Sequence, residues 1–418
     1  MPPIPQDVAL LWGLVFLRMM GYGLTNQVLT LFLHSLGIAD VAIGWFMTAT
    51  LIGDALLSLW LTWRADHWGR RRVVAGGCVA MAISGLVFAS ASSFWVLLLA
   101  AVVGVISPSG DETGPFKSVE EASLAHLTLP EHRAFIYAIH GLAATGGAAV
   151  GSLVAGIVVD QLTLVYQFDD VTAYRVVFVI YAGIAVAKLL FSLLLSPACE
   201  VKVMDVPVVE TEDSQLLLPP SSSTGLSART QRLLAPLLVV FMLDSLGYGL
   251  MPWAWVVYYL KKTFAISATG LGTLFFVINL TDAISSLPSA WIATKLGSVA
   301  AILATQVPSA ILFALVSVVS SFGASAILLL GYAATSTLDV VPRQMLLSAL
   351  FPPHELAKVM GVVNLGKTAA RSVGPPFTGW LAHHGWLHYG FAINGGCVLI
   401  ADAVLASFSG RYSQSQIH

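Results

Sequence analysis

The stretch Asp66-His67-Trp68-Gly69-Arg70-Arg71-Arg72 lies between two apolar segments, residues 43–62 and 73–89. Each segment is long enough to cross a lipid bilayer as a helix, which takes about 20 residues. The glycine allows the chain to reverse without a side chain in the way, and an acid beside it can hold an arginine or a helix N-terminus. We therefore predict a gating latch between two transmembrane helices, formed by Asp66, Gly69, Arg70, Arg71 and Arg72.

The composition is that of a membrane protein throughout. Of the 418 residues, 57% are hydrophobic and 10% are charged, and the mean hydropathy is +0.83. A soluble domain carries about 25% charged residues. Twelve spans use roughly 240 residues, which leaves room for short loops and one linker. We predict an all-α membrane protein with twelve spans whose first span is retained, because the start lacks the basic region of a signal peptide.

The predicted spans are divided by one polar linker. Residues 197–232 hold five acids and the run Pro219-Pro220-Ser221-Ser222-Ser223, a composition typical of a flexible segment. We predict an N-terminal six-helix bundle at 1–196, a cytoplasmic linker at 197–232 and a C-terminal six-helix bundle at 233–418. The twelve expected spans are 8–33, 41–63, 73–91, 94–127, 134–159, 173–196, 233–260, 270–294, 299–320, 325–350, 358–382 and 389–409.

Lysine and arginine are distributed unevenly over the predicted loops and tails. If both termini are cytoplasmic, eleven of these residues lie on the inner side and three on the outer side. Cytoplasmic loops of membrane proteins carry the excess of positive charge. We therefore expect both termini in the cytoplasm and, by default, a plasma-membrane location. The three outer residues are Arg175, Lys261 and Lys262.

The two halves of the sequence repeat one another. Arg18-Met19-Met20-Gly21-Tyr22-Gly23-Leu24 matches Asp244-Ser245-Leu246-Gly247-Tyr248-Gly249-Leu250, and Gly53-Asp54-Ala55 matches Thr281-Asp282-Ala283. Repeats of this kind predict two related helix bundles with a substrate site at their interface near the bilayer midplane. The second latch, Thr294-Lys295-Leu296-Gly297-Ser298, keeps the glycine but has lost the acid and the arginine cluster.

With its latch and its six-plus-six repeat, the chain resembles a twelve-span member of the major facilitator superfamily over almost its whole length. The resemblance implies two pseudo-symmetric six-helix bundles around a central site. Residues 107–116 and 339–344 resemble a subgroup described as exporters. The fifth span, with Gly141, Gly146, Gly147, Gly151 and Gly156, resembles the antiporter-associated motif but lacks its proline. The resemblance therefore implies proton-coupled export of a drug-like molecule or metabolite.

Charged residues within predicted spans are the candidates for the substrate and proton pathway, because charge is costly in a membrane. Arg18 lies near the middle of the first span, and Asp244 is its repeat partner. The two are expected to neutralise one another across the cavity, either as a substrate or proton site or as a structural ion pair. Asp339 and Arg343, in the tenth span, are spaced for an i,i+4 pair around a kink at Pro342.

The fourth span is too long for one straight helix and holds prolines and glycines before Phe116, so we expect it to be broken there. Glu112 and Glu120 in this span are either proton carriers or members of a local ion-pair network. His140 in the fifth span is a proton relay or a hydrogen-bonded core residue. In the family resembled, spans 1, 4, 7 and 10 line the cavity, which implies that Arg18, Glu112, Asp244, Asp339 and Arg343 converge.

Other residues in the spans leave alternatives open. Lys367 and Arg371, four residues apart, either attract an anionic substrate or pair with nearby acids. Asp54 and Asp282 are helix contacts that change during gating, or polar contacts between spans. The close-packing glycines of the fifth span favour tight helix contacts. Among the aromatic residues, Tyr22, Tyr248, Trp253 and Trp255 are candidates for facing a substrate.

These patterns indicate a transporter of a small organic molecule by alternating access, with proton-coupled export as the leading hypothesis. The alternatives are uptake or exchange of an anionic molecule, and a non-transporting membrane sensor. No catalytic or P-loop motif is found, so we expect no enzyme activity and no ATP hydrolysis. The expected partners are a small-molecule substrate, protons and the lipid bilayer. We expect a monomer with no cofactor, no metal and no nucleic acid.

Overall fold

The computed structural model describes residues 5–104, 106, 115–200 and 226–415, and the regular structure in these ranges is helical. Short helical turns follow three of the helices: η1 (Gln161–Val165), η2 (Pro197–Cys199) and η4 (Val316–Val318). The helices are α1 (Gln6–Ser35), α2 (Asp40–Trp68), α3 (Arg70–Ser90), α4 (Phe94–Val103), α5 (Pro115–Leu127), α6 (Pro130–Asp160), α7 (Asp170–Leu193), α8 (Ala228–Leu250), α9 (Trp253–Phe264), α10 (Ala268–Ser285), α11 (Ser289–Leu296), α12 (Ser298–Leu315), α13 (Phe322–Ser336), α14 (Val340–Leu350), α15 (Pro353–His383) and α16 (Tyr389–Ser415).

Each predicted span contains helix. Within the described ranges, ten helical stretches are long and apolar enough to cross a membrane. The other two predicted spans are the fourth, which consists of the separate helices α4 and α5, and the eleventh, which is the more polar helix α15. The expected break in the fourth span is therefore confirmed. The predicted site residue Glu112 lies outside the described residues.

Three spans predicted as single helices are divided. The seventh breaks at Pro252 between α8 and α9, because the residue before a proline is driven out of the helical region, and Met251 has φ −138° and ψ 64°. The eighth breaks next to Pro288, between α10 and α11. In the tenth, the break precedes Pro342, which lies in the first turn of α14, where a proline is tolerated.

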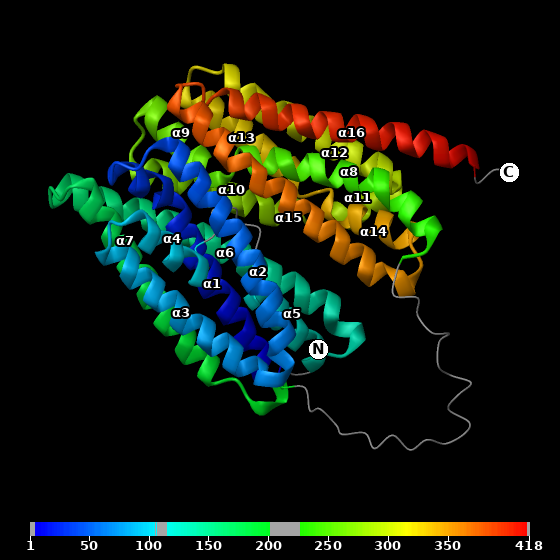
Figure 1. The fold of residues 1–418 in the computed structure, drawn as a ribbon, viewed down its shortest axis with the longest axis horizontal. Coiled ribbons are helices and arrows are strands. Elements are labelled where there is room, and N and C mark those ends of the chain that lie inside the picture. Colours follow the sequence, from blue (N-terminus) through cyan, green and yellow to red (C-terminus); the bar gives the residue numbers. More distant parts are fainter. Residues whose placement is uncertain (1–4, 105, 107–114, 201–225, 416–418) are drawn as a thin grey trace.

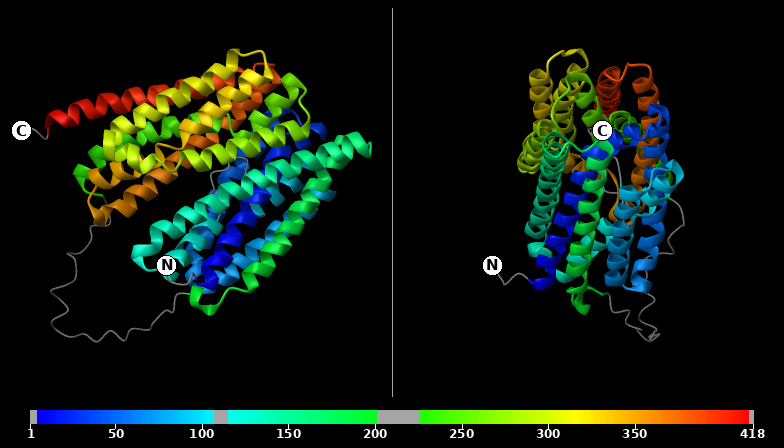
Figure 2. Two further views of the ribbon diagram at one scale, coloured as in Figure 1. Left: turned by 180° about the vertical axis from the view of Figure 1, so that it is seen from behind. Right: turned by 90° about the vertical axis from the view of Figure 1, so that its left-hand side faces the viewer.

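The helices form two groups, which Figure 1 shows side by side. Helices α1–α7 lie in one group and α8–α16 in the other, and both termini lie where the two groups diverge (Figure 1). We call this end the termini side. At the opposite end, which we call the closed side, α2 packs against α15, α6 against α10, and α1 against α9. The view from behind shows the same divergence of the two groups of helices (Figure 2).

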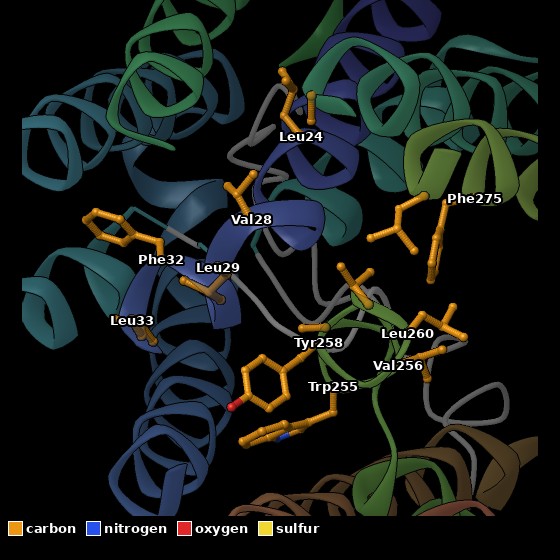
Figure 3. Packing of buried hydrophobic residues seen from close by; sticks show 14 of the residues in the cluster. Leu24, Val28, Leu29, Phe32, Leu33, Trp255, Val256, Tyr258, Leu260 and Phe275 are labelled. Carbon is orange, nitrogen blue, oxygen red and sulfur yellow. The ribbon is translucent and has the colours of Figure 1, made fainter. Parts of the chain in front are cut away.

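A large buried cluster joins the two groups at the closed side. It contains side chains from the last turns of α1, such as Leu29 and Leu33, together with Trp255 and Tyr258 of α9. Figure 3 shows Tyr258 pointing from α9 toward the α1 side chains. Trp255 is fully buried in this cluster, so the hypothesis that it faces a substrate is wrong in this conformation. Apolar burial therefore holds the closed side together.

Candidate functional site

A cavity of about 380 Å³ lies between the two groups of helices. It is lined from the first group by α1 and α6, and from the second group by α8, α9, α10, α12, α13, α14 and α15. The volume suits a small organic molecule. The lining residues with charged or aromatic side chains are Tyr22, Asp244, Tyr248, Trp253, Asp282, Phe313, Tyr332, Asp339, Arg343, Lys367 and Arg371.

Arg343 of α14 lies at the centre of an ion network in this cavity. Its Nη1 atom is 2.8 Å from Oδ2 of Asp244, and its Nε donates to Oδ2 of Asp339, which confirms the predicted i,i+4 pair. Gln306 of α12 donates to the other oxygen of Asp244 at 2.9 Å. Two acids, from the seventh and tenth predicted spans, thus converge on one guanidinium, whose planar fork of donors can bond more than one oxygen.

The expected pairing of Arg18 with Asp244 is wrong in this structure. Both oxygens of Asp244 are bonded within its own group of helices, and Arg18 donates to Glu120 of α5 at 2.8 Å. Lys188 of α7 lies 3.5 Å from the same carboxylate and 3.6 Å from the ring centre of Phe116. Arg18 and Glu120 are buried and do not line the cavity. The two halves therefore each hold their own charge network.

Two further sets of predicted residues do line the cavity. Lys367 and Arg371 reach it from α15, and Asp282 reaches it from α10. Asp54, the repeat partner of Asp282, is instead fully buried within the first group of helices. Three of the four aromatic residues singled out in the sequence, Tyr22, Tyr248 and Trp253, line the cavity as well.

The closed side holds a polar cluster that the sequence did not predict. Asp40 at the start of α2 accepts hydrogen bonds of 3.1 Å from Tyr258 of α9 and lies 3.1 Å from the His34 ring. Lys262 donates to the Tyr258 hydroxyl at 3.1 Å. Because Asp40 and Tyr258 belong to different groups of helices, the cluster must separate when this side opens.

A second connection across the closed side is made by Asp160, the last residue of α6. Its carboxylate accepts hydrogen bonds from the backbone N–H groups of Ala268 and Thr269, at 2.9 and 2.7 Å. These groups lie at the N-terminus of α10, where a negative charge is favourable. Beside them Gly156 packs so closely that a Cβ would overlap the carbonyl oxygen of Ala268. Gly156 therefore allows the two halves to pack closely at this point.

The latch is built around a carboxylate from elsewhere in the chain. Gly69 has φ +93°, as its role in reversing the chain requires. Glu200 accepts from the backbone N–H of Arg70 at 2.7 Å and of Arg71 at 3.2 Å, which caps α3. Arg70 also donates to the carbonyl of Ala122. The side chain of Asp66 lies outside the described residues, and Arg72 is exposed.

The segment that carries Glu200 is held against α1 by hydrogen bonds. Asp7 of α1 accepts from the backbone N–H and the hydroxyl of Ser196 at 2.8 and 2.5 Å. Burial raises the pKa of the neighbouring Cys199 thiol to about 11. Glu200 stands at the start of the polar linker, and the sequence offers no local signal for its partners, because the bonded groups lie about 130 positions apart.

The structure combines a central cavity between two helix bundles with a glycine latch on the termini side. The sequence also matches a known family. The family model of the Major Facilitator Superfamily matches residues 11–254 and 237–416. The chain belongs to this superfamily. It is therefore an integral multi-pass membrane protein with a transporter fold, and its family and fold point to a transporter rather than an enzyme.

Individual proteins are similar in sequence to this chain over different lengths. It is 46% identical to the uncharacterized membrane protein YJR124C of Saccharomyces cerevisiae, over 96% of this chain and 93% of that protein. It is 26% identical to the quinolone resistance protein NorA of Staphylococcus aureus, over 29% of this chain and 31% of that protein. The first relative carries no assigned activity, so the family and not the substrate is established.

Solved structures share the fold at low sequence identity. A bacterial homologue of the human lysosomal transporter Spinster, inward-facing and unoccupied, has a TM-score of 0.73 at 14% identity and covers 96% of this chain and 95% of that one. A D-xylose-proton symporter has a TM-score of 0.72 at 16% identity, with 95% of each chain covered. The human organic anion transporter MFSD10 has a TM-score of 0.63 at 18% identity, covering 96% and 100%.

Proposed function

We propose that this superfamily member is a proton-coupled exporter of a small organic molecule that works by alternating access. The observation that carries the proposal is the cavity between the two groups of helices, which is lined by three acids and closed on one side by contacts between the groups. A site at the interface of two repeats, gated on alternate sides, is how such a fold moves a solute.

In this proposal the bundles 1–196 and 233–418 rock around the cavity, and the linker 197–232 stays in the cytoplasm. The excess of Lys and Arg on the termini side supports a cytoplasmic orientation of both termini. The structure then has the conformation that is closed to the outside. The proposed location is the plasma membrane, and the proposed working unit is a monomer.

The coupling proton is assigned to the acids in the spans. Asp244 and Asp339 share Arg343, so loss or gain of a proton on either acid changes the balance of charge around one guanidinium. Arg18 and Glu120 form the corresponding charged pair in the first bundle, and Glu112 remains part of the proposed pathway. The name of the NorA relative, a quinolone resistance protein, supports export of a drug-like compound.

The test compares small molecules inside and outside cells that express this chain, cells that express the Arg343→Gln variant, and empty cells, each with and without a protonophore. A compound depleted inside and enriched outside only with the unaltered chain, and only with a proton gradient, supports the proposal. Transport that is indifferent to the gradient contradicts proton coupling. No difference across a broad panel favours the membrane-sensor alternative.

A second candidate function is uptake or exchange of an anionic molecule. It is favoured by Lys367 and Arg371, two cationic side chains of α15 that line the cavity. The fold neighbour MFSD10 is named as an organic anion transporter. Accumulation of the compound inside the cells, and strong competition by simple carboxylates or phosphate, would favour this function over export.

A further inference from the structure

Asp282 is the acid of the cavity that keeps an oxygen without a partner. Its Oδ1 atom is buried and accepts no hydrogen bond from the residues that the structure describes. Asp244 is bonded through both oxygens, and Asp339 is held by Arg343. A buried carboxylate without a partner is costly, so such a group calls for a proton or a cation.

Asp282 is partly buried at the wall of the cavity. Asp282 and Asn279, three residues apart on α10, both line the cavity, so one face of the helix is turned to it. The hydroxyl of Thr337, at the end of α13, donates to the backbone carbonyl of Asp282 at 3.3 Å. This contact holds the backbone of α10 at Asp282 against the end of α13, the helix that also carries Tyr332.

That wall consists of Trp253 and Tyr332, which both line the cavity with their ring centres 5.9 Å apart at an interplanar angle of 67°. Phe313, which also lines the cavity, packs against Tyr332 with the ring centres 4.6 Å apart. The faces of Trp and Tyr attract cations through their quadrupoles, most strongly when water is excluded. A carboxylate beside such rings is a chemical complement to an organic ammonium group.

The cationic side chains of the cavity are not the partners of the Asp282 carboxylate. Lys367 and Arg371 belong to α15, which packs against α2, whereas α10 packs against α6. The acid and the two cations therefore approach the cavity from different flanks, and Asp282 makes no ion pair with either cation within the described residues. Asp282 is therefore an acid of the cavity that stands outside the ion network of Arg343.

The repeat partner of Asp282 lies in different surroundings. Asp54 occupies the equivalent position on α2 but is fully buried and does not line the cavity. A carboxylate kept only for packing within each bundle would have the same surroundings in both halves. The exposure of Asp282 to the cavity is therefore a feature of the substrate site.

We propose that Asp282, Trp253 and Tyr332 form the subsite for a protonated amine, and that the substrate is an organic ammonium compound with an apolar or aromatic body. The ammonium group bonds the carboxylate of Asp282 and lies against the aromatic rings. This inference rests on the proposed function, since it names the substrate class of the same central site.

The test is binding of three matched probes to the purified chain in lipid nanodiscs, measured by titration calorimetry. The probes are 1-naphthylmethylammonium, 1-naphthoate and 1-naphthylmethanol, which share a ring system and differ in charge. The ammonium probe is expected to bind at least about tenfold more tightly than the other two, as a charge-assisted bond implies. Asp282→Asn is expected to remove this preference and Asp282→Glu to retain part of it.

Asp54→Asn is the matched control, because it removes a carboxylate at the same repeat position away from the cavity, and it is expected to leave the preference intact. Equal binding of the three probes, tighter binding of naphthoate, or a preference that survives Asp282→Asn overturns the inference. The assay uses no proton gradient and no transport, so its failure leaves the proposed export to be judged by its own experiment.

Discussion

The hydroxyl of Tyr258 on α9 donates a 3.1 Å hydrogen bond to the carboxylate of Asp40 on α2, and so joins the two bundles at the closed side. The same hydroxyl accepts from Lys262 and lies 3.2 Å from the His34 ring. Any conformation open at this side has to lose the bond between Tyr258 and Asp40. The bond therefore contributes to the free-energy difference between the two states of the proposed transport cycle.

Replacing Tyr258 by Phe should favour opening of the closed side. A hydrogen bond to a charged group contributes about 1.5–3 kcal/mol, so the population ratio of the two states should change roughly tenfold or more. Distances between spin labels on the closed-side ends of α1 and α9 would report the change. Tyr259→Phe is the control, since its ring packs on Phe391 and Phe264 in its own bundle. Equal distance distributions in both variants would contradict this role.

Gly156→Ala should loosen the closed side by a steric route. The added Cβ would meet the backbone carbonyl of Ala268 in the other bundle, and overpacking of this kind costs about 1–3 kcal/mol. Gly151→Ala would instead meet the carbonyl of Met20 within the first bundle, and Gly146→Ala would meet no described atom within 4 Å.

The three glycine variants are separated by two measurements. We expect lower thermal stability for Gly156→Ala and Gly151→Ala, a wider closed side only for Gly156→Ala, and no loss of stability for Gly146→Ala. If Gly156→Ala left both the unfolding temperature and the label distances unchanged, the close approach of α6 and α10 would contribute neither to stability nor to closure of this side.

Arg18→Ala should abolish transport and lower stability together. It leaves Glu120 buried without its 2.8 Å partner, and breaking a buried pair costs about 3–5 kcal/mol. The triple variant Arg18→Ala, Glu120→Ala and Lys188→Met removes all three charges of this network and should recover part of the stability. Transport that stays absent in the stable triple variant would assign the network a role in the pathway. Transport that returns with stability would reduce the network to a structural contact.

Glu200→Ala should slow turnover with little effect on substrate binding. The variant removes the carboxylate that caps α3 at Arg70 and Arg71, and loss of a cap costs about 0.5–2 kcal/mol. We expect the same kinetic pattern for Arg70→Ala and Asp66→Asn. Transport rates at equal surface expression would measure it, with Glu200→Gln as a variant that keeps an acceptor. Unchanged turnover in all three variants would remove the latch from the gating mechanism.

Much of the fold follows from local patterns. Apolar runs of membrane length predicted the helices, because an apolar segment in lipid has to satisfy its backbone hydrogen bonds within itself. The break in the fourth span and the reversal at Gly69 were predicted by proline and glycine chemistry at those residues. The division of the seventh span at Pro252 was missed, although the proline itself was the available signal.

Local sequence patterns could not predict which residues pair with most of the charged side chains. Spacing predicted the pair of Asp339 and Arg343, because residues four apart on one helical turn are neighbours. It could not predict that Arg18 meets Glu120 rather than Asp244, since a span's hydrophobicity shows that it lies in the membrane but not which helix lies beside it.

The sequence by itself determined that this chain is a membrane protein of two related helix bundles, with a latch-bearing loop between the second and third spans and a polar linker between the bundles. Helix length, apolar content and turn chemistry determine these features because they act over a few residues. Only the tertiary structure decided which acids face the cavity, that one oxygen of Asp282 accepts no hydrogen bond from the described residues, and that Tyr258 and Asp160 close one side. These contacts depend on how helices far apart in sequence pack, and that packing is selected by free-energy differences summed over the whole molecule.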